Sequence, residues 1–105
     1  MQHALVWGLR IVMTFLDTNA ELDYNILVAD GCAFAKKAHD YWVKSRKAQR
    51  HHDMELSRKY RRYSKYLDKQ ANVNARYAVM MIADVPHDDL TAQWIYLSFK
   101  ESVKH

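Results

Sequence analysis

Residue types that bind metals or transfer protons gather in one short stretch of this sequence. His51, His52, Asp53 and Glu55 are near neighbours, and His51 and Glu55 share one face if the stretch is helical. A zinc site needs three or four ligands, and no further ligand with suitable spacing is evident nearby. We therefore interpret the stretch as a hinge with polar capping residues, and we expect no metal site.

The dipeptide His-Asp occurs three times, at positions 39–40, 52–53 and 87–88. This pattern invites comparison with metal-dependent phosphohydrolases, with His39, His52, Asp53 and Asp84 as ligands. The chain is short for such a fold and the dipeptide is common. The sequence also lacks a G-x-S-x-G turn, a P-loop and a Cys–His nucleophile pair. We expect a protein that is not an enzyme and that carries no cofactor.

Basic residues are concentrated in the middle of the chain. The stretch RKYRRYSKYLDK, residues 58–69, contains six basic residues and three tyrosines. Residues 36–76 hold 13 Lys/Arg against 4 Asp/Glu, whereas the rest of the chain holds 3 against 8. The net charge of +4 therefore hides a strongly basic centre between acidic ends. Such segregation favours an anionic partner, or pairing of the centre with the ends.

Helical spacing separates the basic residues of this region from its apolar ones. A stripe with spacings of three, four and seven lies about 200° from the predicted apolar seam. Its members are Arg58, Arg62, Lys65, Lys69 and Arg76. Arg61 widens the stripe, and a second row on the preceding helix comprises Lys44, Lys47 and Arg50. Among residues 58–69, only Asp68 offsets the repulsion between the cations.

This stripe is open to three interpretations: a solvated helix face, a contact with nucleic-acid phosphates, or a contact with an acidic protein surface. Like charges at helical spacing are destabilising, and an anionic partner removes that cost. Tyr60 and Tyr63 fall on the apolar seam and are expected to pack in the core. Tyr66 lies off the seam and is free to stack on a base. No motif for sequence-specific readout is present.

The helices that position these residues are predicted from periodicity and caps. A first helix is expected at about 3–16, with a strand as the alternative. Thr18 and Glu21 then fit a capping box that opens a long helix to about residue 50. Gly31 is expected to kink or break it. Its apolar face comprises Leu22, Ile26, Ala29, Ala33, Ala38, Tyr41, Ser45 and Ala48.

A reversal at residues 51–53, with Asp53 as N-cap, leads into the next helix. Its seam comprises Leu56, Tyr60, Tyr63, Leu67, Gln70, Asn74, Tyr77 and Met81. The polar positions suggest a short break near 70–73. The stretch ADVP at 83–86 is expected to end this helix, and HDDL to open a last one with a stripe of Leu90, Trp94 and Leu97. Trp42 and the pair Met80–Met81 are also expected in the core.

Bulk composition limits the fold class. Half of the 105 residues are apolar, and only two Gly and one Pro interrupt the chain, which favours long helices over a sheet. We expect an all-α protein: a single helical domain over residues 1–105, folded as a compact bundle of four or five helices with one or two long central ones. The single cysteine, Cys32, indicates a reducing compartment such as the cytoplasm.

The N-terminal run ALVWGLRIVMTFL is too short for a membrane span and contains Arg10. We expect a core helix there and no membrane association, with Met13 as an alternative start. Trp7 in this run is a candidate anchor for a protein partner.

The leading functional hypothesis is a non-catalytic protein that binds the nucleic-acid backbone, RNA or DNA, without strong sequence specificity, as an accessory subunit of a nucleoprotein complex. The alternative is a small interaction module, of phage-inhibitor or adaptor type, that docks its basic face on an acidic protein surface. A third hypothesis is a homodimer whose register is set by Gln70 and Asn74.

Overall fold

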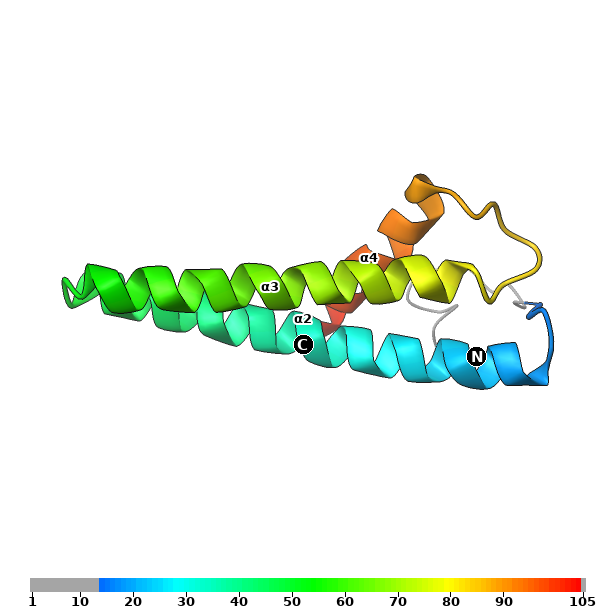
Figure 1. Cartoon of the computed structure of the whole chain (residues 1–105), viewed down its shortest axis with the longest axis horizontal. Coiled ribbons are helices and arrows are strands. Elements are labelled where there is room, and N and C mark those ends of the chain that lie inside the picture. Colours follow the sequence, from blue (N-terminus) through cyan, green and yellow to red (C-terminus); the bar gives the residue numbers. More distant parts are fainter. Residues whose placement is uncertain (1–13, 105) are drawn as a thin grey trace.

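The computed structural model describes residues 14–104, which form three helices (Figure 1). They are α2 (Thr18–Arg50), α3 (Met54–Val79) and α4 (Asp89–Val103). Helices α2 and α3 form a long antiparallel hairpin, and α4 packs against the half of it away from the tip. The all-α prediction is confirmed. The prediction of four or five helices is not, because this part of the chain contains three.

The molecule is elongated, which corrects the prediction of a compact bundle. Its extents are 51 × 22 × 21 Å and its radius of gyration is 15.8 Å, whereas a compact domain of this length has about 13 Å. Because α4 is short and covers only one half of the hairpin, the tip half consists, among residues 14–104, of two helices alone (Figure 1). The tip therefore has little core and much surface.

The predicted first helix lies mostly outside the described residues. At its end, Phe15 is extended and forms an isolated antiparallel bridge with Ile82. The amide of Leu16 donates to the Met81 carbonyl at 3.1 Å. This pairing also explains why α3 ends at Val79 and not at the predicted ADVP stretch: the chain turns so that Ile82 can be buried against the N-terminal segment.

Small side chains dominate the buried surface of the two long helices. The small buried residues are Ala20, Gly31, Ala35, Ala38, Ser45 and Ala48 in α2, and Ser57, Ala71, Ala75 and Ala78 in α3. Small residues let helix axes approach closely. The hairpin is thus held by close backbone approach, with large buried side chains confined to the end where α4 packs.

Side-chain hydrogen bonds fix the register of the hairpin at three levels. Each runs from a side-chain donor on one helix to a backbone carbonyl on the other, so these polar groups are satisfied. From the tip, they are Ser45 Oγ to Ser57 O at 3.0 Å, Ser64 Oγ to Ala38 O at 2.7 Å, and Asn74 Nδ2 to Leu27 O at 3.2 Å. Asn74, predicted to set register between two chains, bonds within one chain.

The buried face of α2 differs from the predicted one in its first half. Leu22, Ile26, Ala29 and Ala33 are exposed, and the buried residues there are Tyr24, Val28, Gly31 and Ala35. The two faces converge in the tip half, where Ala38, Ser45 and Ala48 are buried as predicted. The cause is α4, which places the buried ring of Phe99 directly against Gly31. Gly31 therefore marks a close approach in an unbroken helix.

The predicted faces of α3 and α4 also need correction. Helix α3 is continuous through residues 70–73. Its buried face includes Ser57 and Ala71, which lie one residue after the predicted Leu56 and Gln70. Tyr63 is exposed as a result. On α4 the predicted stripe is exposed, and the buried residues are Thr91, Ala92, Ile95, Tyr96 and Phe99. Trp42, Trp94 and Met80, predicted in the core, are exposed too.

Each of the three described helices begins at an aspartate. Asp53 accepts a hydrogen bond from the Leu56 amide at 3.1 Å, which confirms the predicted cap of α3. Asp88 caps α4 in the same way. At α2 the cap is Asp17, one residue before the predicted Thr18. Aspartate accepts hydrogen bonds from the free amides of a first turn as well as threonine does. The residue types at positions 17 and 18 therefore do not decide which of the two caps the helix.

Tyr24 provides a test of the core at the end where α4 packs. Burial, with a smaller contribution from Cys32, raises the pKa of Tyr24 to about 12. Above pH 10 the unfolded chain ionises this phenol while the folded chain does not. Between pH 10 and 12, the ionisation of this one phenol is therefore expected to lower the free energy of unfolding by about 1.4 kcal/mol per pH unit. Urea unfolding should show a shallower pH dependence in Tyr24→Phe, and an unchanged one in the exposed control Tyr77→Phe. Equal slopes in the wild type and Tyr24→Phe would contradict the buried placement.

Candidate nucleic-acid interface

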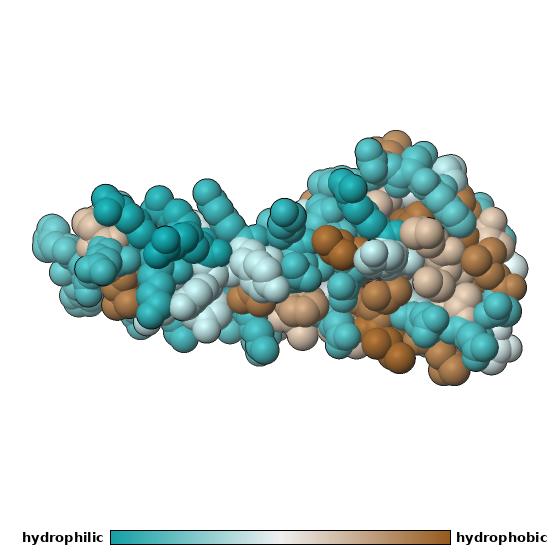
Figure 2. Space-filling model, viewed as in Figure 1, coloured by the Kyte–Doolittle hydropathy of each residue, from teal (hydrophilic) through white to brown (hydrophobic). Residues whose placement is uncertain are grey.

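All ten residues predicted to contact nucleic acid have exposed side chains, and nine of them lie in the tip half of the hairpin or next to it. The ten are Lys44, Lys47, Arg50, Arg58, Arg61, Arg62, Lys65, Tyr66, Lys69 and Arg76. Figure 2 shows that the visible surface of the tip is largely hydrophilic, whereas apolar side chains gather toward the other end. The structure therefore separates a polar, basic arm from an apolar base.

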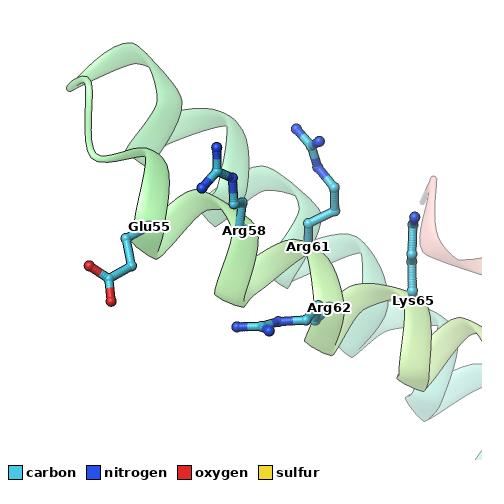
Figure 3. Close-up of a pocket in the computed structure, with 5 residues that line it drawn as sticks. All are labelled: Glu55, Arg58, Arg61, Arg62 and Lys65. Carbon is cyan, nitrogen blue, oxygen red and sulfur yellow. The ribbon is translucent and has the colours of Figure 1, made fainter.

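Three of these residues project together from α3. Figure 3 shows Arg58, Arg61 and Lys65 pointing to the same side of the helix, while the carboxylate of Glu55 points away from them. Together with Arg62, which points in another direction, they line a shallow concavity. Arg58 directly follows buried Ser57, and Lys65 directly follows half-buried Ser64, and both serines lie on the face of α3 that packs on α2. The cations therefore lie about 100° from this packed face, and not opposite to it as predicted.

Helix α2 adds cations to the same flank. Trp42, Arg46 and Arg50 line a second concavity together with Arg61 of α3, and the Arg46 guanidinium lies 5.1 Å from the centre of the Trp42 ring. Arg61 lines both concavities, which joins the two into one surface. We call this surface the basic flank and define it by Arg46, Arg50, Arg58, Arg61 and Lys65.

The remaining predicted cations lie elsewhere. Lys44 and Arg46 stand on either side of buried Ser45, about 100° from it in opposite directions. Lys44 accordingly contacts tyrosines of the other flank, with its ammonium 5.1 Å from the Tyr41 ring centre and 6.0 Å from that of Tyr60. Lys47 lies two positions beyond Ser45 and faces away from the seam. The predicted second row is therefore divided between two flanks.

The far end of the predicted stripe is also separate from the basic flank. Arg76 lies near the end of α3, where its Nε donates to Asn72 Oδ1 at 3.2 Å. Lys69 and Tyr66 are exposed on the outer surface, Tyr66 by 62%. Tyr66 is thus free of the core, as predicted.

Two acidic residues near the basic flank, Asp68 and Asp53, are engaged elsewhere. Asp68 accepts a hydrogen bond from the Tyr96 hydroxyl at 2.5 Å and pairs with Lys100 at 3.5 Å, and Asp53 caps α3. Burial, followed by the bond to Asp68, raises the pKa of Tyr96, which keeps this phenol a proton donor. The two ion pairs within residues 14–104 are Lys100–Asp68 and Lys104–Glu101. The basic flank is therefore less compensated than the sequence indicated.

Sequence reasoning missed Arg46 of the basic flank and Trp42, which lines the same concavity. Arg46 was not selected because it falls outside the predicted second row, and Trp42 was assigned to the core. The available signal was their spacing of four residues, which places a cation over an indole on one helix face. Recognising it required the correct phase of the α2 seam.

The residues considered for metal chemistry do not come together. His52 and Asp53 lie at the tip of the hairpin, His39 is within α2, and Asp84 follows α3 at the opposite end. Within residues 14–104, no group of three or more His, Cys, Asp or Glu side chains is placed to hold a metal ion.

None of the three helices of the described segment is both long enough and apolar enough to cross a membrane. No protein-family model matches the sequence, and neither a characterised protein nor a solved structure matches it. The functional interpretation consequently depends on the charges and geometry of the surface described above.

Proposed function

We propose that this protein is a non-catalytic, cytoplasmic subunit of a nucleoprotein complex that binds the phosphate backbone of nucleic acid through its basic flank. One observation supports the proposal above all others: five exposed cations share one surface, while Asp68 bonds to Tyr96 and the carboxylate of Glu55 points away from Arg58, Arg61 and Lys65 (Figure 3). Like charges that remain unpaired in the free protein repel one another. A polyanion removes that repulsion and releases its own condensed counterions on binding.

The residue types suit phosphate. Four of the five members of the basic flank are arginines, whose planar guanidinium donates two parallel hydrogen bonds to a phosphate. Arginine also remains charged up to about pH 12. Contacts of this kind fix position and carry no sequence information.

The sequence contains no motif for sequence-specific readout of bases. We therefore propose that contacts with a duplex are made to its backbone, without strong sequence specificity.

The base of the molecule supports membership of a larger assembly. Leu90, Trp94 and Leu97 form an exposed apolar stripe on α4, which packs on the half of the hairpin away from the tip (Figure 1). Exposed apolar stripes of this kind are typical of protein contacts. The same basic flank also suits an acidic protein surface, which is the alternative function.

Fluorescence anisotropy with labelled ligands tests this proposal. The purified protein is titrated, at about 50 mM salt, with single- and double-stranded RNA and DNA of two unrelated sequences, and with polyglutamate as an acidic polypeptide. We expect binding to nucleic acid with affinities that differ less than about tenfold between the two sequences. Stronger binding to polyglutamate than to any nucleic acid would favour the alternative, and no binding to nucleic acid would refute the proposal.

A further inference from the structure

Trp42 lies exposed in the angle between the three helices. Its side chain is 47% exposed and lines a concavity of about 810 Å³ between α2, α3 and the C-terminal half of α4. Pockets that hold small ligands have volumes of about 300–1,000 Å³. An indole of this exposure contributes little to the core, so its position requires another explanation.

Neighbouring side chains orient this indole. The Arg46 guanidinium lies 5.1 Å from the ring centre, and the His39 ring is stacked at 6.3 Å with an interplanar angle of 24°. These residues are four positions after and three positions before Trp42, so the three form one line along α2. The ring is thus held against the helix with part of its surface directed into the concavity.

Cations surround the concavity on its other walls. Lys65 comes from α3, and Lys100 and Lys104 come from α4. The acidic residues of the wall are Asp68 and Glu101, which pair with Lys100 and Lys104. Lys65 has no such partner among the described residues, and it also belongs to the basic flank. The concavity is therefore continuous with the proposed phosphate-binding surface.

We propose that Trp42 stacks on an unpaired base, and that the preferred ligand is single-stranded nucleic acid. The inference rests on the proposed function, because phosphates on the basic flank bring the strand to the concavity. A flat aromatic ring beside a row of cations matches the two parts of a nucleotide. A duplex keeps its bases stacked inside and cannot present one to Trp42, whereas an acidic peptide would use the lysines without the indole.

Single-residue variants test the role of Trp42 in the full chain. Affinities of Trp42→Ala and Trp42→Phe are measured for a single strand of about 15 nucleotides and for the matching duplex. We expect Trp42→Ala to lose about 5- to 100-fold in affinity for the single strand, with little change for the duplex. Trp42→Phe, which keeps a ring, should recover most of the loss. The control is Trp94→Ala, because Trp94 is 53% exposed on α4 outside this concavity.

Tryptophan fluorescence gives a second readout that does not depend on affinity. The sequence contains three tryptophans, so a variant carrying Trp7→Phe and Trp94→Phe retains Trp42 alone. Its emission should be quenched by saturating single strand and should change little with saturating duplex. Circular dichroism of every variant confirms that the helices are retained.

The outcomes separate this inference from the proposal on which it rests. Wild-type protein that binds both nucleic acids, with Trp42→Ala equal to wild type on the single strand, would overturn the stacking role alone. An equal loss of affinity for single strand and duplex in Trp42→Ala would also overturn it. Wild-type protein that binds neither would overturn both the inference and the proposed function.

Discussion

Replacing Arg58, Arg61 and Lys65 with glutamine is expected to weaken nucleic-acid binding by a factor on the order of 100 at about 0.1 M salt. These residues project to one side of α3 and line the first concavity of the basic flank (Figure 3), and Arg61 also lines the second. Each phosphate that loses its contact keeps its condensed counterions. The three losses in affinity multiply. Glutamine keeps much of the length and helix propensity of the original residues, so the change is mainly one of charge.

A control variant carries the same change in net charge on other surfaces of the tip. Lys44→Gln, Lys47→Gln and Lys59→Gln remove three charges from residues that face the tyrosine-bearing flank or the outer surface. We expect this variant to lose less than about tenfold in affinity, through long-range attraction alone. Anisotropy titrations of both variants distinguish the effect of net charge from that of the basic flank. Equal losses would show that net charge, and not the basic flank, determines binding.

Neither variant should disturb folding. The substituted side chains are exposed, and the ion pairs among residues 14–104 involve none of them. Removing like charges from one helix reduces repulsion by a few tenths of a kcal/mol per pair. Melting temperatures equal to or slightly above that of wild type are therefore expected, and a lost affinity can be assigned to the interface.

Gly31→Ala is expected to destabilise the protein, against the trend of helix propensity. In a helix interior, alanine is more favourable than glycine by about 1 kcal/mol. At Gly31, however, an added Cβ would lie 2.6 Å from Cζ and 2.8 Å from Cδ2 of Phe99, whose ring is fully buried. Overpacking of this kind costs about 1–3 kcal/mol. The ring cannot yield without moving α4 off the hairpin, so we expect a net loss in the free energy of unfolding.

Urea unfolding of Gly31→Ala and of Ala33→Gly measures this effect. Ala33 is exposed two residues along the same helix, and Ala33→Gly should cost about 1 kcal/mol from propensity alone. If Gly31→Ala instead raised the stability by a similar amount, α4 would not pack on α2 as described.

The fold class and the caps follow from local signals in the sequence. Scarce Gly and Pro exclude frequent reversals, and an aspartate before a helical stretch satisfies the free amides of its first turn wherever the helix packs. Asp53 and the reversal before it were predictable for this reason. The elongated shape was not, because nothing in the sequence states that the last helix covers only half of the hairpin.

The buried faces were mispredicted because hydrophobicity was taken as the guide to the core. Leu22, Ile26 and Trp94 are large and apolar, yet the hairpin buries alanine, serine and glycine. Close helix approach depends on small side chains, and their burial leaves large ones on the flanks. Residue size at the seam therefore carried more information than residue polarity.

The candidate site was predictable in composition and not in arrangement. Lysine and arginine avoid burial in any fold, so exposure of nine of the ten selected residues, all but Tyr66, follows from their types. Their division between flanks depends on the phase of the seam, and a shift of one residue rotates a side chain by about 100°. The same shift moved Trp42 from the expected core to the surface beside Arg46.

The dependence of affinity on salt tests the central claim most directly. A duplex that contacts the five cations of the basic flank should give a log–log slope of about −4.5 between affinity and salt concentration. In the variant with Arg58, Arg61 and Lys65 replaced by glutamine, the slope should fall to about −2. A wild-type slope near zero, or the same slope in wild type and variant, would contradict phosphate binding by the basic flank.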